Sequence, residues 1–181
     1  MKILGISGSL RQQSFNTASL RAAQSLLPAE VEMELADLSG IPMYDQDLRD
    51  QDVPESVITL ATQIQQADAL LFATPEYNYS ISGALKNAID WVSRQSPNPF
   101  NGKPAAMMSA SMSMLGGVRA QYDLRQMMVF QDVHCLNKPE VMIASAHQRF
   151  DAEGNLTDDA TREHIEGLIK ALVNWANRIN Q

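Results

Sequence analysis

Hydrophobic residues recur along the chain with two different spacings. Short apolar runs without polar alternation are typical of strands that are covered on both faces of a parallel sheet. Four such runs span Lys2–Ser7, Ala69–Thr74, Pro104–Ala110 and Pro139–Ala144. Residues 31–35 instead alternate between apolar and charged side chains, which predicts a half-exposed strand at the edge of the sheet.

Between these strands, apolar residues recur every three to four positions, as on the buried face of a helix. The predicted helices span Thr17–Leu27, Glu55–Gln66, Leu85–Val92, Val118–Phe130 and Thr157–Ile179. Pro28 ends the first one, because proline cannot continue a helix. The acidic segment Asp37–Pro54 contains two prolines, and we expect it to form a long surface loop.

Five strands that alternate with five helices predict an α/β fold, with a doubly wound five-stranded parallel sheet and helices on both faces. Neither a composition break nor an internal repeat divides the chain, so we expect a single domain over residues 1–181. Ligands of such sheets bind beyond the carboxyl ends of the strands, where the strand order reverses. We therefore expect the site on the loops after the first, third and fourth strands.

The loop after the first strand is rich in hydrogen-bond donors. It contains Ser9, Arg11, Ser14, Asn16 and Thr17 and leads into a helix, whose first N–H groups lack partners. The loop matches neither the Walker motif nor the three-glycine dinucleotide motif, which argues against ATP or a pyrophosphate as the ligand. The remaining ligand is a terminal phosphate monoester, as on a mononucleotide. The alternative is an ordinary strand-to-helix turn in which Thr17 caps the helix.

The loop after the third strand combines aromatic, acidic and amide side chains. It contains Pro75, Glu76, Tyr77, Asn78 and Tyr79. Such a set suits a planar heterocycle, because aromatic side chains cover the ring and amides bind its polar rim. The alternative is an asparagine-containing turn whose tyrosines pack on neighbouring helices.

Charge and composition limit the other function classes. The chain has 14 Lys and Arg against 21 Asp and Glu, a net charge of −7, so without a basic patch we expect neither nucleic-acid nor membrane binding. No apolar stretch approaches a membrane span, and the single cysteine, Cys135, excludes an intrachain disulfide, so we expect a cytoplasmic protein. We interpret Cys135 as a small buried hydrophobe. The three histidines lack a metal-binding spacing, so we expect no metal site.

Three motifs together closely resemble the NADPH-dependent FMN reductase family. They are Gly8-Ser9-Leu10-Arg11 with Ser14 and Asn16, the segment Pro75–Ser80 with Gly83–Trp91, and the segment Gly116–Gln121 with Leu124–Gln126. The resemblance runs from Met1 to about Ile143. It implies a flavodoxin-like fold, non-covalent FMN and NAD(P)H as co-substrate. It also implies acceptors such as quinones, free flavin, and chromate or azo compounds.

The same resemblance implies roles for individual residues. Ser9, Arg11, Ser14, Asn16 and Thr17 would hold the FMN phosphate, and Pro75, Glu76, Tyr77 and Asn78 would wrap the isoalloxazine ring. The loop Ser109–Gly117 would line the pyrimidine side of the ring, through Ser109, Ser111 or Ser113. No side chain is expected to act as a catalyst, because the cofactor carries the chemistry.

Two further expectations concern function class and assembly. The main alternative is a flavodoxin-type single-electron carrier, which would use the same loops; a flavin-binding sensor is a third reading. From the resemblance, the long loop 37–54 and the apolar residues Met127, Met128 and Phe130, we expect a homodimer or homotetramer.

Overall fold

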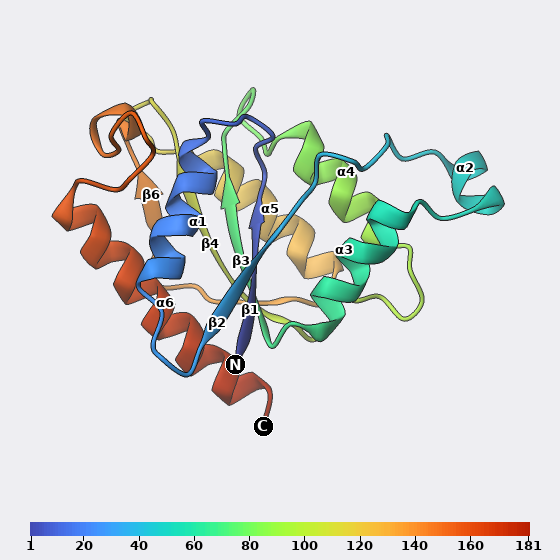
Figure 1. Cartoon of the computed structure of the whole chain (residues 1–181). Coiled ribbons are helices and arrows are strands. Elements are labelled where there is room, and N and C mark those ends of the chain that lie inside the picture. Colours follow the sequence, from blue (N-terminus) through green and yellow to red (C-terminus); the bar gives the residue numbers. More distant parts are fainter.

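The computed structural model describes residues 1–181 and contains a parallel sheet with the order β2-β1-β3-β4-β5 (Figure 1). The strands are β1 (Lys2–Ser7), β2 (Glu32–Ala36), β3 (Ala69–Thr74), β4 (Pro104–Ala110), β5 (His134–Cys135) and β6 (Val141–Ile143). Every pairing is parallel, and β6 shares the fifth position with β5 because both pair with β4. This order is that of the flavodoxin-like fold and confirms the predicted fold class.

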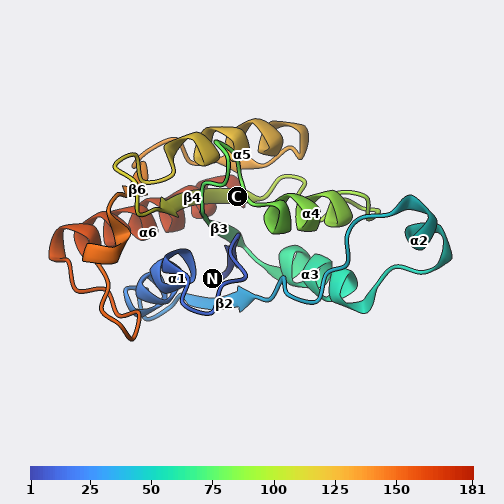
Figure 2. The same cartoon turned by 90° about the horizontal axis from the view of Figure 1, so that it is seen from above.

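Helices cover both faces of the sheet (Figure 2). On one face lie α1 (Phe15–Ser25) and α6 (Asp159–Ile179), and on the other lie α3 (Glu55–Gln66), α4 (Gly83–Val92) and α5 (Val118–Phe130). The sheet therefore has a separate hydrophobic core on each side. All residues of β3 and β4 are buried, which explains why their sequences show apolar runs instead of alternation.

The predicted fifth strand, Pro139–Ala144, is shorter in the structure, where β6 spans Val141–Ile143. A separate two-residue strand, β5, precedes it; the chain leaves β4 after Leu136 and pairs with it again from Val141. Pro139 has no N–H group to donate to a ladder, and β6 begins beyond it. The backbone carbonyl of Leu136 instead accepts a hydrogen bond of 2.9 Å from the Arg125 guanidinium.

Helices α1, α4 and α6 have boundaries two residues from the predicted ones, and the structure contains one additional helix. Helix α1 begins two residues earlier than expected, because Ser14 rather than Thr17 is the N-cap and accepts a hydrogen bond from the Thr17 N–H. Helix α6 begins at Asp159, with Asp158 as its N-cap. The segment 37–54 contains the short helix α2 (Gln46–Gln51), whose N-cap is Asp45 and none of whose residues is buried.

The segment 37–54 forms an arm that extends beyond α3 and α4 (Figure 1). The Pro42 carbonyl accepts hydrogen bonds of 2.8 Å from both the Trp91 indole and the Asn87 amide of α4, and Arg49 of α2 donates to the Arg94 carbonyl at 3.0 Å. The Tyr44 ring packs edge-on against Trp91, with 5.0 Å between centroids. These contacts hold the arm beside α4, while no residue of α2 enters the core.

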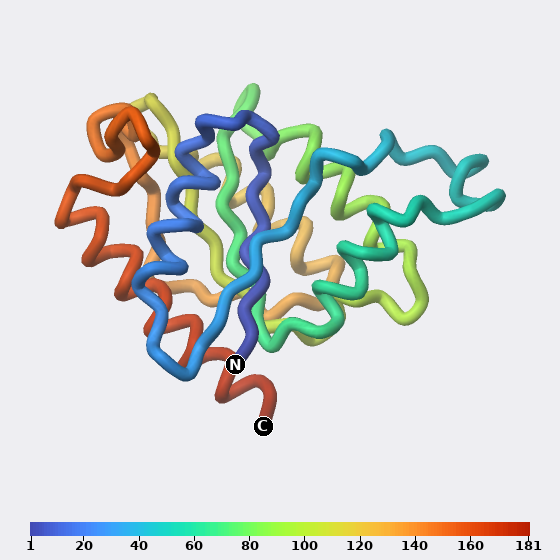
Figure 3. Tube along the Cα trace, viewed as in Figure 1, coloured from blue at the N-terminus to red at the C-terminus, as the bar shows by residue number.

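The loops after β1, β3 and β4 meet at one end of the sheet, and both termini lie at the opposite end (Figure 3). This is the arrangement expected when parallel strands all end at the same edge. A short 3-10 helix, η1 (Ala146–Gln148), follows β6 at the loop end. None of the helices has the length and apolar composition needed to cross a membrane.

Candidate FMN-binding site

The three predicted loops border one cleft of about 230 Å³ at the carboxyl edge of the sheet. The candidate residues that line it are Ser9, Arg11, Ser14, Asn16, Pro75, Glu76, Tyr77 and Ser111. Phe15, Ala110 and Met112 complete the wall. The other candidates, Thr17, Asn78 and Ser109, belong to the same loops but do not line the cleft.

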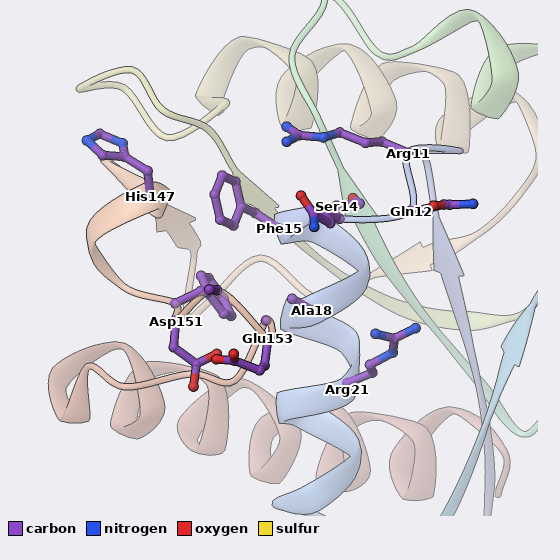
Figure 4. A pocket seen from close by; sticks show the side chains of 13 residues that line it. Arg11, Gln12, Ser14, Phe15, Ala18, Arg21, His147, Asp151 and Glu153 are labelled. Atoms are coloured by element: carbon purple, nitrogen blue, oxygen red, sulfur yellow. The ribbon is translucent and has the colours of Figure 1, made fainter.

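The β1–α1 loop offers the cleft several hydrogen-bond donors that no protein group uses. The backbone N–H groups of Gln12, Gln13 and Ser14 have no acceptor within the protein and precede the first turn of α1; Ser14 lines the cleft, and Gln12 and Gln13 line the hollow beside it (Figure 4). The Arg11 side chain is exposed and has no ion pair or hydrogen bond. Unpaired N–H groups at a helix N-terminus, next to a free guanidinium, form a typical phosphate-binding arrangement.

Asn16 and Thr17 instead hold this loop against the sheet. The buried Asn16 side chain donates to the Ala110 carbonyl at 3.0 Å and accepts from the Ala110 N–H at 2.9 Å. The Thr17 and Ser7 hydroxyl oxygens lie 2.8 Å apart. Because these polar groups already have partners, the geometry indicates a positioning role for both residues.

The β3–α4 loop contains a two-residue turn between Tyr77 and Ser80. The N–H of each of these residues donates to the carbonyl of the other, at 2.9 and 3.0 Å, and the central residues Asn78 and Tyr79 have φ angles of 52° and 69°. Asparagine tolerates this conformation better than most residues. The turn leaves the Tyr77 side chain 51% exposed at the cleft and the N–H groups of Glu76 and Asn78 without protein acceptors.

Glu76 links this loop to the start of α5. Its carboxylate accepts a 3.0 Å hydrogen bond from the backbone N–H of Arg119 and forms a 2.9 Å ion pair with the Arg119 guanidinium. The same guanidinium lies 4.1 Å from the centroid of the Tyr79 ring. A carboxylate at a helix N-terminus also interacts favourably with the helix dipole. Arg119 was not among the candidate residues, since no local spacing relates it to Glu76.

The β4–α5 loop is held by a buried network below the cleft. The Ser109 hydroxyl donates to the Gly116 carbonyl at 2.6 Å and accepts from the Gln121 amide at 2.8 Å. Gln121 also donates to the Val141 carbonyl at 2.8 Å, while its own side-chain oxygen has no partner. Ser109 is fully buried, so of the predicted serines it is Ser111 that faces the cleft.

Other chemically active groups do not contribute to the cleft. Burial raises the pKa of the Cys135 thiol to about 11, so almost none of it is thiolate at neutral pH. No group of three or more His, Cys, Asp and Glu side chains could hold a metal ion. The cleft thus offers phosphate donors at one end and aromatic and backbone groups at the other, which fits FMN.

A flavodoxin-like sheet with such a cleft at its switch point defines the class of FMN-binding α/β proteins. The chain belongs to the NADPH-dependent FMN reductase family, whose sequence profile matches residues 1–148. This confirms the resemblance inferred from the three motifs.

Individual relatives match over nearly the whole chain. The NAD(P)H-dependent FMN reductase of Pseudomonas aeruginosa is 56% identical, over 99% of this chain and 97% of its own length. The quinone reductase of Escherichia coli is 40% identical over the same shares. The structure is similar to that of the flavoenzyme NAD(P)H:(acceptor) oxidoreductase of Paracoccus denitrificans, with a TM-score of 0.89 and 34% identity, covering 98% of this chain and 97% of the other.

Proposed function

We propose that this protein is an NAD(P)H-dependent reductase that holds FMN non-covalently in the cleft and reduces quinones or free flavin. One observation carries the proposal. Arg11 and Ser14, which carry unused donors, line the same cleft as the exposed Tyr77, and the loops that hold them follow the neighbouring strands β1 and β3. The relatives named above, an FMN reductase and a quinone reductase, support the same reaction.

The residues divide into those that would touch FMN and those that position them. Ser9, Arg11 and Ser14, together with the free N–H groups of the loop, would bind the phosphate. Pro75, Glu76, Tyr77 and Asn78 would wrap the ring, through the backbone and the Tyr77 side chain, and Ser111 would lie at its pyrimidine side. Asn16, Thr17 and Ser109 would act through the loops that they hold.

Bound FMN would supply the redox chemistry, which is hydride transfer from a nicotinamide and two-electron reduction of an acceptor. The protein's part is to fix the ring and to leave one face open to both substrates. Tyr77 and Met112, which are 51% and 61% exposed, border that opening. The side chain of Glu76 would not touch the substrates, because Arg119 holds it at the start of α5.

Steady-state kinetics of the FMN-loaded protein test this proposal. Donor and acceptor that use one ring face in turn should give parallel lines in double-reciprocal plots, with inhibition by excess acceptor. Tyr77→Ala should slow both half-reactions, whereas Tyr77→Phe, which keeps the ring, should slow neither. Intersecting lines, or a Tyr77→Ala defect toward the donor alone, would show two separate substrate sites.

The same measurement distinguishes the single-electron carrier. A carrier would bind FMN but would not oxidise NAD(P)H by itself in steady state. Chromate and azo compounds stay predictions among the acceptors, to be compared with quinones in the same assay.

A further inference from the structure

One acidic side chain lies in the wall of the flavin cleft. Of the eleven residues that line the cleft, only Glu76 carries a carboxylate. A hydride brings two electrons and one proton to the flavin ring, so the reduced ring carries more negative charge than the oxidised ring. Charges near the ring nitrogens tune this balance. An unpaired carboxylate in the wall would therefore disfavour the reduced ring, unless another group compensates its charge.

Arg119 compensates this charge with two groups. Its backbone N–H donates to Glu76 Oε2 at 3.0 Å, and its guanidinium forms a 2.9 Å ion pair with Oε1. The Glu76 side chain is 13% exposed and that of Arg119 is 41% exposed, so the carboxylate is the more enclosed partner. Both carboxylate oxygens are thus occupied at the start of α5.

The first turn of α5 also depends on this contact. Gly117 is the N-cap of α5 and has no side chain that could accept a hydrogen bond from that turn. The Glu76 carboxylate takes this role from the β3–α4 loop, and the helix dipole favours a negative charge there. The wall of the cleft and the helix therefore share one carboxylate, whose position Arg119 fixes.

The same guanidinium contacts the other end of the turn that presents Tyr77. It lies 4.1 Å from the centroid of the Tyr79 ring, in the geometry of a cation–π interaction. Glu76 and Tyr79 lie on either side of Tyr77 and Asn78 in the chain. Arg119 consequently holds the segment that borders the flavin ring from both sides.

We propose that Arg119 is a positioning residue for flavin reduction, which keeps the Glu76 carboxylate paired at α5 and so keeps its charge from acting on the ring. The inference rests on the proposed function, since it places the flavin ring beside Glu76. Two unit charges about 10 Å apart near a protein surface change an equilibrium constant by roughly tenfold. Without Arg119, reduced FMN should therefore lose about that factor in affinity relative to oxidised FMN.

The midpoint potential of the bound flavin tests this proposal. A tenfold weaker relative binding of reduced FMN lowers a two-electron potential by about 30 mV. We expect this shift in FMN-loaded Arg119→Ala, measured by anaerobic titration against a dye of known potential. Arg178→Ala is the matched control, because it removes another arginine that lies over an aromatic ring, that of Trp175 on α6. The control should keep the wild-type potential.

Further variants show whether Arg119 acts through Glu76. Glu76→Gln keeps an oxygen that can accept from α5 but removes the negative charge, so the double variant Glu76→Gln/Arg119→Ala should regain the wild-type potential. Arg119→Lys keeps a cation that can pair with Glu76, so its potential should lie closer to that of the wild type than the potential of Arg119→Ala. Glu76→Gln alone should not lower the potential.

Three results would overturn the inference. They are a wild-type potential in Arg119→Ala, a fall in potential in Glu76→Gln, and a double variant whose potential stays as low as that of Arg119→Ala. The last result would mean that the guanidinium acts on the ring directly. A failure of the proposed function looks different, because the FMN-loaded wild type would then not oxidise NAD(P)H in the presence of quinone, whatever its potential.

Discussion

Gly117, at the end of the loop that borders the flavin cleft, cannot be replaced by alanine without strain. Its φ angle is +87°, in the left-handed region that residues with a Cβ avoid. An added Cβ would lie 2.8 Å from the Ser109 Cβ and 3.0 Å from its hydroxyl oxygen. Rotating the hydroxyl away does not relieve the shorter contact, because the Cβ is fixed to the backbone of the central strand β4.

The two effects together set the size of the change. The left-handed conformation costs alanine roughly 1–2 kcal/mol, and overpacking of a buried site costs about 1–3 kcal/mol. We therefore expect Gly117→Ala to lower the free energy of unfolding by roughly 2–5 kcal/mol, which corresponds to a fall in Tm of about 4–20 °C for a chain of this size. The displaced loop should also weaken FMN binding.

Gly167 supplies a matched control. It lies exposed inside helix α6, and an added Cβ meets no atom within 4 Å. Gly167→Ala should stabilise the protein by about 0.5–1 kcal/mol, since alanine favours the helix interior. Urea unfolding followed by circular dichroism measures both variants. If Gly117→Ala unfolds at the same urea concentration as the wild type, the reasoning from φ and the Ser109 contact is wrong.

Three other predictions concern the ligand, the pH response and the assembly. Arg11→Ala should raise the FMN dissociation constant about tenfold to a hundredfold, because one charge-assisted hydrogen bond is lost, and should leave riboflavin binding unchanged. Fluorescence titration measures the binding of both ligands. Equal effects on the two ligands would show that Arg11 does not bind the phosphate. The pKa of Asp158 is lowered to about 2 by hydrogen bonds from the Thr161 hydroxyl and N–H, and further by Arg149. The ionised Asp158 carboxylate therefore stabilises the fold fully above about pH 4, and this stabilisation is lost as the pH falls toward 2. Urea unfolding should show that the difference in unfolding free energy between wild type and Asp158→Ala shrinks over that range. A difference that stays constant would contradict this. Light scattering should show a homodimer or homotetramer, and a 20 kDa species at micromolar concentration would count against it.

The apolar residues that are exposed at the end of α5 differ from the three on which the oligomer prediction was based. Met128 is fully buried against the sheet, while Val129 and Phe130 are 79% and 87% exposed. Met128 shares the buried face of α5 with Gln121 and Leu124, whereas Val129 and Phe130 lie on other sides of the helix, away from the sheet. The exposed apolar pair is therefore Val129 and Phe130, and Phe130 is the shared member of both sets.

Local patterns in the sequence determined the order and type of the main elements. The strands β1, β3 and β4 and the helices α3 and α5 have the predicted bounds, because apolar runs and helical periodicity depend on residues close together in the chain. The parallel topology then required the loops after β1, β3 and β4 to meet, which places most candidate residues around one cleft.

Only the tertiary structure decided which polar groups remain free for a ligand. Asn16 pairs with the backbone of Ala110, 94 residues away, and Glu76 pairs with Arg119, 43 residues away. Spacing in the sequence carries no information on such partners, since they meet only when strands and helices from distant segments pack. The same holds for the hollow beside the cleft, whose far wall comes from residues 147–154. A hydrogen-bonding side chain becomes a binding group only where packing leaves it without a protein partner.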